Sequence, residues 1–342
     1  MKTEYIKVTP DSAEALSRAG EIIRRGGLVA FPTETVYGLG GNALDPTAAE
    51  KIFAAKGRPG DNPLIVHVAD PAEAESFAYT NETYRKLCEK FAPGPLTIIL
   101  PKKEAVPYSV TGGLDTVAVR CPSNPVANAL IRAAGVPIAA PSANISGAPS
   151  PTSAQHVLHD MNGRIDMILD GGECDIGVES TVISLDADGM GCTVLRPGEI
   201  IPRELCTVVK NVSVARAVTD PSAAGDRPQS PGMKYKHYAP ASELILLDGD
   251  RESFAKYVNA DSRRCVVLSY SGHGGDFANA VVLDIGDEGD AHTQMKRLFS
   301  LLRDTDALDA DVIYAHLPPQ TDEFLALYNR IIRAAGCEVI KL

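Results

Sequence analysis

The stretch KGRPGDNPLIVH, residues 56–67, carries side chains that could bind a polyanion. Lys56 supplies a compact positive charge and Arg58 a planar guanidinium, and this combination suits the phosphate groups of a nucleotide. Two prolines stiffen the turn, so less entropy is lost when the cations bind a ligand. The chain contains no Gly-Lys dipeptide and therefore no Walker phosphate loop. The segment predicts a phosphate site of another kind, although two solvated loop cations would give the same pattern.

Hydroxyl and amide side chains gather in two further segments that follow predicted strands. In FPTETVYGLGGNA, Thr35 comes soon after a strand, and the glycines allow a ligand to approach the backbone closely. In PSANISGAPSPTS, a tight loop carries Ser142, Asn144 and Ser150 before a predicted helix, whose N-terminus favours anions. Helix capping would explain one of these residues but not all of them, so the loop also indicates an anionic ligand.

Charged and polar residues also occupy the ends or interiors of predicted strands. Arg120 ends an apolar strand, where a cation on the buried side needs an anionic partner, and a ligand carboxylate would serve. His67 lies within a strand, and by itself it is more typical of a core histidine than of a ligand contact. Arg196 precedes a Pro-Gly turn, and Ser180 stands in GVESTVISL. Cations, hydroxyls and amides with few general bases suit the electrostatic stabilisation of phosphoryl or nucleotidyl transfer.

Other kinds of site find little support. No Gly-x-Ser-x-Gly elbow is present, so a nucleophilic serine is not indicated. His156 and His159 share one face of a predicted helix without a third ligand, and the seven cysteines form no Cys-x-x-Cys pair. Neither a metal site nor a disulfide framework is therefore predicted. The net charge of −11 argues against tight non-specific binding of nucleic acid, but it allows a local basic cleft.

A scaffold must bring these residues together, and the sequence predicts an α/β domain for residues 1–205. Short apolar strands mixed with helical stretches favour a twisted mixed sheet. Strands are expected at 28–31, 64–68, 96–100, 117–120, 138–140, 167–169, 181–184 and 192–196, and helices at 12–25, 48–55, 82–91, 125–134 and 153–161.

The second part of the chain is predicted to be a linker followed by a smaller domain. Residues 220–239 are rich in Pro, Gly, Ser and charge, so residues 206–240 are expected to form a linker or lid. Residues 241–342 are expected to form a Rossmann-like α/β domain, whose glycine cluster does not fit a dinucleotide motif. Without a long apolar run or a signal peptide, a cytoplasmic protein with no membrane contact is expected. Strands are expected in this domain at 244–247, 265–270, 281–285 and 312–315, and helices at 292–303 and 323–335.

The chain resembles the YrdC-like family of threonylcarbamoyl-AMP synthases. The motifs that carry the resemblance are FPTETVYGLG, KGRPGDNPLIVH, FAPGPLTIIL, VAVRCP, PSANISG, GVESTV and LRPG. The family's Lys-x-Arg and Ser-x-Asn signature stands here as Lys56, Arg58, Ser142 and Asn144. SPGMKYKHYAP, followed by a small α/β domain, is similar to the long, two-domain form, so the resemblance spans nearly the whole chain.

The resemblance implies a nucleotidyltransferase that joins L-threonine, bicarbonate and ATP into threonylcarbamoyl-adenylate and releases pyrophosphate. The product supplies the N6-threonylcarbamoyl group of adenosine 37 in tRNAs that read ANN codons, and tRNA-threonylcarbamoyl transferase proteins are the expected downstream partners. Mg²⁺ is the expected cofactor, held through the ATP phosphates rather than by dedicated protein ligands. Binding to tRNA or double-stranded RNA itself is expected to be weak at most.

The resemblance also assigns residues to each substrate. Lys56 and Arg58 are the expected catalytic residues, and Arg120 is expected to hold the threonine carboxylate. Both reaction intermediates are labile in water, so the linker around Tyr238 is expected to cover the site. The residues expected to bind ATP are Lys56, Arg58, Asn62, Thr116, Ser142, Asn144, Ser150, Arg196 and Tyr238. Those expected to bind threonine are Thr35, His67, Arg120, Ala140 through its backbone, and Ser180.

Two other functions remain open at this point. One is carbamoyl transfer from carbamoyl phosphate, as in a related domain of hydrogenase-maturation proteins, although this chain lacks the Cys-x-x-Cys pairs of their zinc fingers. The other is a module that binds double-stranded RNA or the ribosome, because the family's cleft is concave and locally positive. Net acidity counts against RNA binding. Salt-sensitive RNA binding without threonine-dependent ATP turnover would favour it.

Overall fold

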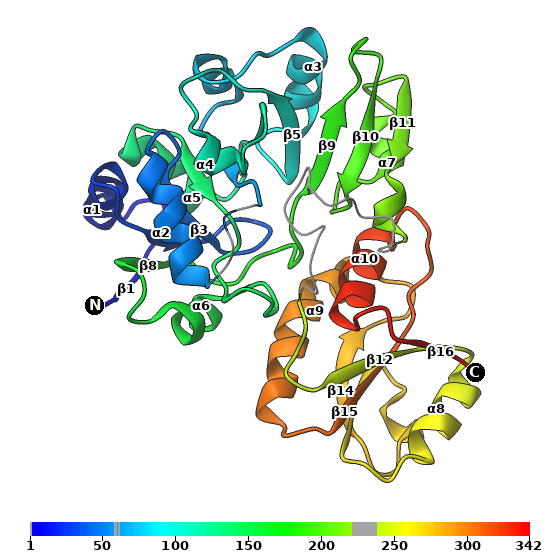
Figure 1. Cartoon of the computed structure of the whole chain (residues 1–342). Helices are drawn as coiled ribbons and strands as arrows, with labels where there is room; N and C mark the ends of the chain where they lie inside the picture. Colours follow the sequence, from blue (N-terminus) through cyan, green and yellow to red (C-terminus); the bar gives the residue numbers. More distant parts are fainter. Residues whose placement is uncertain (1, 58–59, 61, 221–237) are drawn as a thin grey trace. The chain divides into compact units, whose positions relative to one another are not determined.

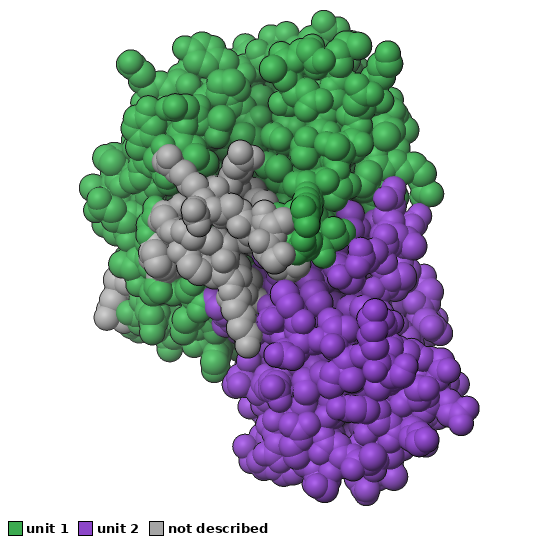
Figure 2. Space-filling view, turned by 45° about the vertical axis from the view of Figure 1, so that its right-hand side comes forward, with its two compact units in different colours: residues 1–146, 150–175, 179–234 green, residues 147–149, 176–178, 235–342 purple. Residues whose placement is uncertain are grey.

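The computed structural model describes residues 2–57, 60, 62–220 and 238–342. Contacts divide the chain into two compact units, coloured green and purple in Figure 2. Two short segments that precede residue 179 belong to the second unit. The first unit consists of Met1–Ser146, Ser150–Asp175 and Glu179–Lys234, and the second of Gly147–Pro149, Ile176–Val178 and Tyr235–Leu342.

The described residues of the first unit form an 11-stranded sheet. Its strands are β1 (Glu4–Lys7), β2 (Val29–Phe31), β3 (Gly38–Asn42), β4 (Ile65–His67), β5 (Leu96–Pro101), β6 (Thr116–Arg120), β7 (Ile138–Ala140), β8 (Met167–Asp170), β9 (Thr181–Leu185), β10 (Gly191–Arg196) and β11 (Asn211–Val214). They lie in the order β1-β8-β2-β3-β7-β4-β6-β5-β9-β10-β11 (Figure 1). Parallel pairs such as β4 with β6 occur beside antiparallel pairs such as β5 with β6, so the predicted mixed sheet is confirmed.

Helices pack on both faces of this sheet. They are α1 (Ala13–Arg24), α2 (Pro46–Lys56), α3 (Glu82–Phe91), α4 (Tyr108–Thr111), α5 (Pro125–Ala134), α6 (Ala154–Met161) and α7 (Pro202–Leu205), with 3₁₀ turns at Pro71–Ser76 and Arg216–Val218. Side chains alternate along each strand, so Val29 and Phe31 join one hydrophobic core with α1 and α5. Ala30, between them, joins the other core, which contains α2 and α6.

The ends of two helices are fixed by their local sequence. Helix α2 follows Asp45, whose side chain caps it, and it ends before Gly57, which has a φ of 63° that favours glycine. Lys56 is therefore held in the last helical turn. Helix α5 follows Asn124, whose side chain caps it, and this cap fixes the short loop after Arg120.

The second unit contains a parallel sheet with helices, as predicted. Its elements are β12 (Glu243–Asp248), α8 (Arg251–Asn259), β13 (Cys265–Tyr270), β14 (Val281–Gly286), α9 (Ala291–Asp304), β15 (Val312–His316), α10 (Leu325–Ala334) and β16 (Val339–Lys341), with 3₁₀ turns at Gly274–Asp276 and Thr305–Ala307. The five strands lie in the order β14-β13-β15-β12-β16, and all neighbours are parallel. None of the described helices is both long and apolar enough to cross a membrane.

The structure adds strands and helices that the sequence did not predict, namely β1, β3, β11, β16, α4, α7 and α8. The glycine run GLGGN was expected to be a turn, but it forms β3 between β2 and β7. A Cβ at Gly40 would lie 2.8 Å from side-chain atoms of Ile138 and Phe31, so glycine permits close packing here. Strand β11 lies inside the expected linker and pairs with β10. Residues 221–237 of that linker lie outside the described residues, and the predicted domain boundaries stay predictions.

Candidate active site

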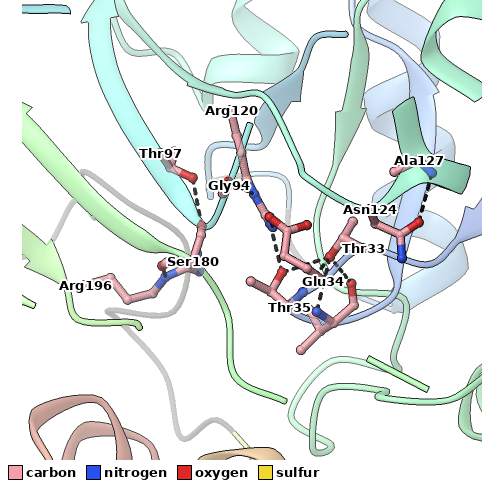
Figure 3. Close-up of polar contacts among 11 residues, drawn as sticks. Thr33, Glu34, Thr35, Gly94, Thr97, Arg120, Asn124, Ala127, Ser180 and Arg196 are labelled. Carbon is pink, nitrogen blue, oxygen red and sulfur yellow. Dashed lines mark hydrogen bonds and ion pairs between the residues drawn. The ribbon is translucent and has the colours of Figure 1, made fainter. Parts of the chain in front are cut away.

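Arg120, at the end of β6, is almost fully buried (Figure 3). Its Nη2 lies 2.8 Å from Oε1 of Glu34, and the two side chains are only 4% and 6% exposed. Its Nη1 donates a hydrogen bond to Oγ1 of Thr35 at 2.9 Å. Burial disfavours charge on Glu34, but the nearby charge of Arg120 opposes this effect, and the pKa of that carboxyl is lowered. The anion that the sequence predicted for Arg120 is thus present within the protein.

The turn after β2 presents Thr35 to Arg120 through a chain of hydrogen bonds (Figure 3). Oγ1 of Thr33 donates to the carbonyl oxygen of Val36 at 2.6 Å and lies 2.8 Å from Oγ1 of Thr35. A hydroxyl has one proton, so Thr35 must be the donor to Thr33. Thr35 in turn accepts from Arg120. The direction of every bond in this chain is therefore fixed before any ligand arrives.

His67, the last residue of β4, lies opposite Arg120 in the register of β4 and β6. Its Nδ1 lies 3.1 Å from the carbonyl oxygen of Ile65 and 3.3 Å from that of Ile138. Carbonyl oxygens only accept, so Nδ1 carries the proton and Nε2 keeps a lone pair. Burial, and secondarily the charge of Arg120, lowers the pKa of His67 to about 3. The ring is therefore neutral near pH 7 and can accept a hydrogen bond at Nε2.

Ser180, just before β9, lies between two side chains from other strands (Figure 3). Its Oγ is 2.7 Å from Oγ1 of Thr97, and Thr97 stands opposite Arg120 in the register of β5 and β6. Arg196 donates from Nη2 to Oγ of Ser180 and from Nε to its carbonyl oxygen, both at 3.1 Å. Arg196, predicted to bind the nucleotide, is thus brought to a residue predicted to bind threonine.

Neighbouring strands therefore bring four of the residues predicted to bind threonine to one edge of the sheet. Strand β4 carries His67, β6 carries Arg120, and Ser180 enters β9 beside β5. Thr35 reaches the same place through its bond to Arg120. Ala140, the fifth residue predicted to bind threonine, ends β7 and pairs with Ile65 of β4.

A second group of predicted residues gathers around Lys56, which is only 2% exposed. Its Nζ donates to the carbonyl oxygen of Ser142 at 2.5 Å and to that of Asn144 at 2.8 Å. Oγ of Ser142 donates to Oδ1 of Asn144 at 2.5 Å. The two halves of the Lys-x-Arg and Ser-x-Asn signature therefore meet at Lys56. Its ammonium group holds the loop that presents the serine and asparagine.

Asn62 and Ser150 are both fully buried, with different surroundings. Neither the oxygen nor the nitrogen of the Asn62 amide has a hydrogen-bond partner among the described residues. A buried amide without partners is costly, so this side chain is suited to a polar ligand. Oγ of Ser150 donates to Oε1 of Glu179 at 2.6 Å. Glu179 is itself only 7% exposed.

Two of the described residues predicted to bind ATP do not join these groups. Thr116 begins β6, whose other end carries Arg120, and four strand residues span about 13 Å. Tyr238 belongs to the second unit, where its ring lies 4.9 Å from that of Phe299. Arg58 lies outside the described residues. These three assignments stay predictions.

Sequence reasoning missed the partners that hold the predicted residues. Thr97 lies in an apolar strand and gave no signal. Glu34 was noted only as a polar residue after a strand, and nothing in the sequence paired it with Arg120. Glu179 could have been suspected, because GVESTV places a carboxylate just before a buried strand. Tyr37, which follows in the same turn as Thr35, is buried and donates its hydroxyl to the carbonyl oxygen of Gly172 at 2.6 Å.

The described residues contain no group of three or more His, Cys, Asp and Glu side chains that could hold a metal ion. His159 faces Asp160, with its Nδ1 3.0 Å from Oδ1 of that residue. All seven cysteines are free thiols.

Comparison with known proteins agrees with the fold. Residues 21–198 match the Sua5_yciO_yrdC family profile, described as "Telomere recombination", and residues 200–336 match the C-terminal domain of threonylcarbamoyl-AMP synthase. The threonylcarbamoyl-AMP synthase of Bacillus subtilis is 43% identical over 100% of both chains. That of Pyrococcus abyssi is 45% identical over 95% of both chains. A crystal structure of P. abyssi Sua5 complexed with L-threonine superposes with a TM-score of 0.90, at 42% identity and over 100% of both chains.

The fold and the site define a two-domain protein of the Sua5–YciO–YrdC class. More closely, the chain belongs to the threonylcarbamoyl-AMP synthase family, and its relatives match it over both domains. The resemblance found in the sequence is therefore confirmed, and the chain is an enzyme.

Proposed function

We propose that this chain makes threonylcarbamoyl-AMP and pyrophosphate from L-threonine, bicarbonate and ATP, and so acts as a nucleotidyltransferase. The observation that carries the proposal is the convergence of Thr35, His67, Arg120 and Ser180 at one edge of the sheet. Figure 3 shows three of them, Thr35, Arg120 and Ser180. The family membership and the L-threonine bound to the P. abyssi relative support it.

In the proposed threonine site, the polar groups complement an amino acid zwitterion. Arg120 holds the carboxylate, while Glu34 and Thr35 keep its guanidinium in place. His67 offers only a lone pair at Nε2, so it accepts a hydrogen bond from the threonine hydroxyl or amine. A neutral histidine suits this task, because a charged ring beside Arg120 would repel the substrate's ammonium group.

The proposed reaction has two steps. The neutral amine of threonine attacks the carbon of CO₂, which bicarbonate supplies, and loses a proton to give a carbamate. A carbamate oxygen then attacks the α-phosphorus of ATP. The bond from that phosphorus to the bridging oxygen breaks, and pyrophosphate leaves. Two anions must approach each other in this second step, so catalysis depends on positive charge and on orientation.

Residues of this chain supply that charge and orientation in the proposal. Lys56 holds the loop with Ser142 and Asn144 against the phosphates, and Arg58 adds the second cation of the signature. Asn62 gives the nucleotide its amide, which has no hydrogen-bond partner in the part of the chain that the structure describes. Arg196 lies against Ser180, where the carbamate and the α-phosphate would meet.

Mg²⁺ fits this arrangement as a companion of ATP. The hydroxyl and amide groups near Lys56 can bind phosphates, and the described residues offer no carboxylate cluster that would hold a metal by itself. When bound with ATP, the ion would neutralise phosphate charge. The product would pass to tRNA-threonylcarbamoyl transferase proteins for modification of adenosine 37. Because tRNA is the final acceptor, we place the reaction in the cytoplasm.

Pyrophosphate release tests the proposal directly. The purified chain is incubated with ATP and Mg²⁺, with threonine and bicarbonate present together or omitted singly, and the adenylate is identified by mass spectrometry. Release is expected only when all substrates are present. Pyrophosphate release that does not need threonine would contradict the assignment, and turnover of carbamoyl phosphate in place of bicarbonate would favour carbamoyl transfer.

A further inference from the structure

Each of the loops that carry Ser150 and Ser180 contains a three-residue stretch that belongs to the second unit. These stretches are Gly147–Pro149 and Ile176–Val178. Pro149 is joined to Ser150 by one peptide bond, and Val178 directly precedes Glu179 and Ser180. Both stretches contact the same helix, α9. Helix α9 therefore contacts the chain shortly before Ser150 and shortly before Glu179.

Arg303, in the last turn of α9, makes the first contact. Its Nη2 donates to the carbonyl oxygen of Pro149 at 2.5 Å. A charged donor makes this a strong hydrogen bond. The carbonyl oxygen of Gly147 accepts from the backbone nitrogen of Ala239 at 3.0 Å, so the stretch is held at both ends.

Gly177 makes the second contact, about two helical turns before Arg303 along α9. A Cβ at this position would lie 2.5 Å from both the Cα and the carbonyl oxygen of Lys296. The φ of Gly177 is +82°, a conformation that side chains disfavour. The backbone of this loop therefore lies directly against the backbone of α9.

The two loops are also joined to each other inside the first unit. Oγ of Ser150 donates to Oε1 of Glu179 at 2.6 Å, and these residues are 0% and 7% exposed. Helix α9 thus contacts the chain one residue before Ser150 and two residues before Glu179. We propose that α9 sets the position of both loops, with Arg303 as a positioning residue for the binding of ATP at Ser150. The kinetic part of this proposal rests on the proposed function.

Kinetics of the full-length chain test the role of Arg303. Arg303→Ala should raise the KM for ATP by about tenfold, the effect of one charged hydrogen bond, with smaller changes in kcat and in the KM for threonine. Arg303→Lys should restore part of the affinity, because lysine can also donate to the carbonyl of Pro149. Arg297→Ala is the matched control, since Arg297 lies on α9 but pairs with Asp284 at 2.9 Å and is 47% exposed. Equal KM values for ATP in the two alanine variants would overturn the proposal.

Hydrogen exchange provides a second test that needs no activity. Peptides covering residues 146–153 and 175–182 are compared in the wild type and both arginine variants by mass spectrometry. Both peptides should exchange faster in Arg303→Ala, but not in Arg297→Ala. Gly177→Ala should give the same result and replaces Arg303→Ala if that variant does not fold. Unchanged exchange would refute the proposal, even if the wild type showed no threonine-dependent turnover.

Discussion

The buried ion pair between Arg120 and Glu34 makes a quantitative prediction about stability. Glu34→Gln keeps the shape of the side chain and removes its charge, so Arg120 keeps a buried charge without its counterion. Breaking one partner of a buried ion pair costs about 3–5 kcal/mol. With an m-value of about 2.5 kcal/mol/M in urea, the unfolding midpoint should fall by about 1.2–2 M.

An exposed pair of the same chemistry provides the control. Arg18 lies 2.6 Å from Glu4, but the two side chains are 51% and 42% exposed. Exposed pairs contribute about 1 kcal/mol or less, so Glu4→Gln should move the midpoint by less than about 0.4 M. Far-UV circular dichroism follows the transition, because the chain has no tryptophan for fluorescence. Removing both charges with Glu34→Gln and Arg120→Gln should cost less than the sum of the single changes.

The pH dependence gives a second arm of the same test. The pKa of Glu34 is lowered in the folded protein, so its contribution to stability is present above the ordinary carboxyl pKa of 4.5 and is lost as the pH falls below it. The difference in unfolding midpoint between the wild type and Glu34→Gln should therefore become smaller as the pH is lowered. Equal midpoints for Glu34→Gln and Glu4→Gln at pH 7 would refute the reasoning.

Three further predictions follow from the buried polar residues. Asn62→Ala should raise the KM for ATP by about tenfold. It should not lower the melting temperature, because the amide has no partner to lose among the described residues. A lower melting temperature with an unchanged KM would contradict this prediction. Lys56→Met should lower kcat by about 10²-fold or more, whereas Lys51→Met on the same helix, which removes a bond to the carbonyl of Gly26, should leave kcat near the wild-type value. The folded-state pKa of His67, about 3, lies below its unfolded value of 6.5, so the stability it contributes is lost as the pH falls from 6.5 toward 3. His67→Asn should flatten that loss in urea titrations, and an identical pH profile would show that His67 is not the group responsible.

Much of the fold could be predicted because its signals are local. Short β-branched runs marked β4 to β10, and the pairing of proline at the start with glycine at the end marked α2 and α5. Strand β3 was missed because its glycines look like a turn in sequence, and only the packing of Phe31 and Ile138 shows why they are in a strand. Strand β1 was not predicted because it is short and its partner, β8, lies about 160 residues away in the chain. Glu4, for example, pairs with Met167.

The candidate site shows the same limit. The residue types and motifs identified Lys56, Arg120 and Ser180, but the hydrogen bonds that fix them come from distant segments. Arg120 meets Glu34 and Thr35, which lie 86 and 85 residues earlier in the chain. No local pattern encodes such a pair, because register and topology, not spacing, bring the two segments together.

These partners also change how the cations of the site should be counted. Arg120 faces the carboxylate of Glu34, so that pair has no net charge. On the proposed function, a pair without net charge suits threonine, which is a zwitterion. A count of cations from the sequence alone therefore overestimates the positive charge that is available to phosphates, because the residue that neutralises Arg120 belongs to a different motif.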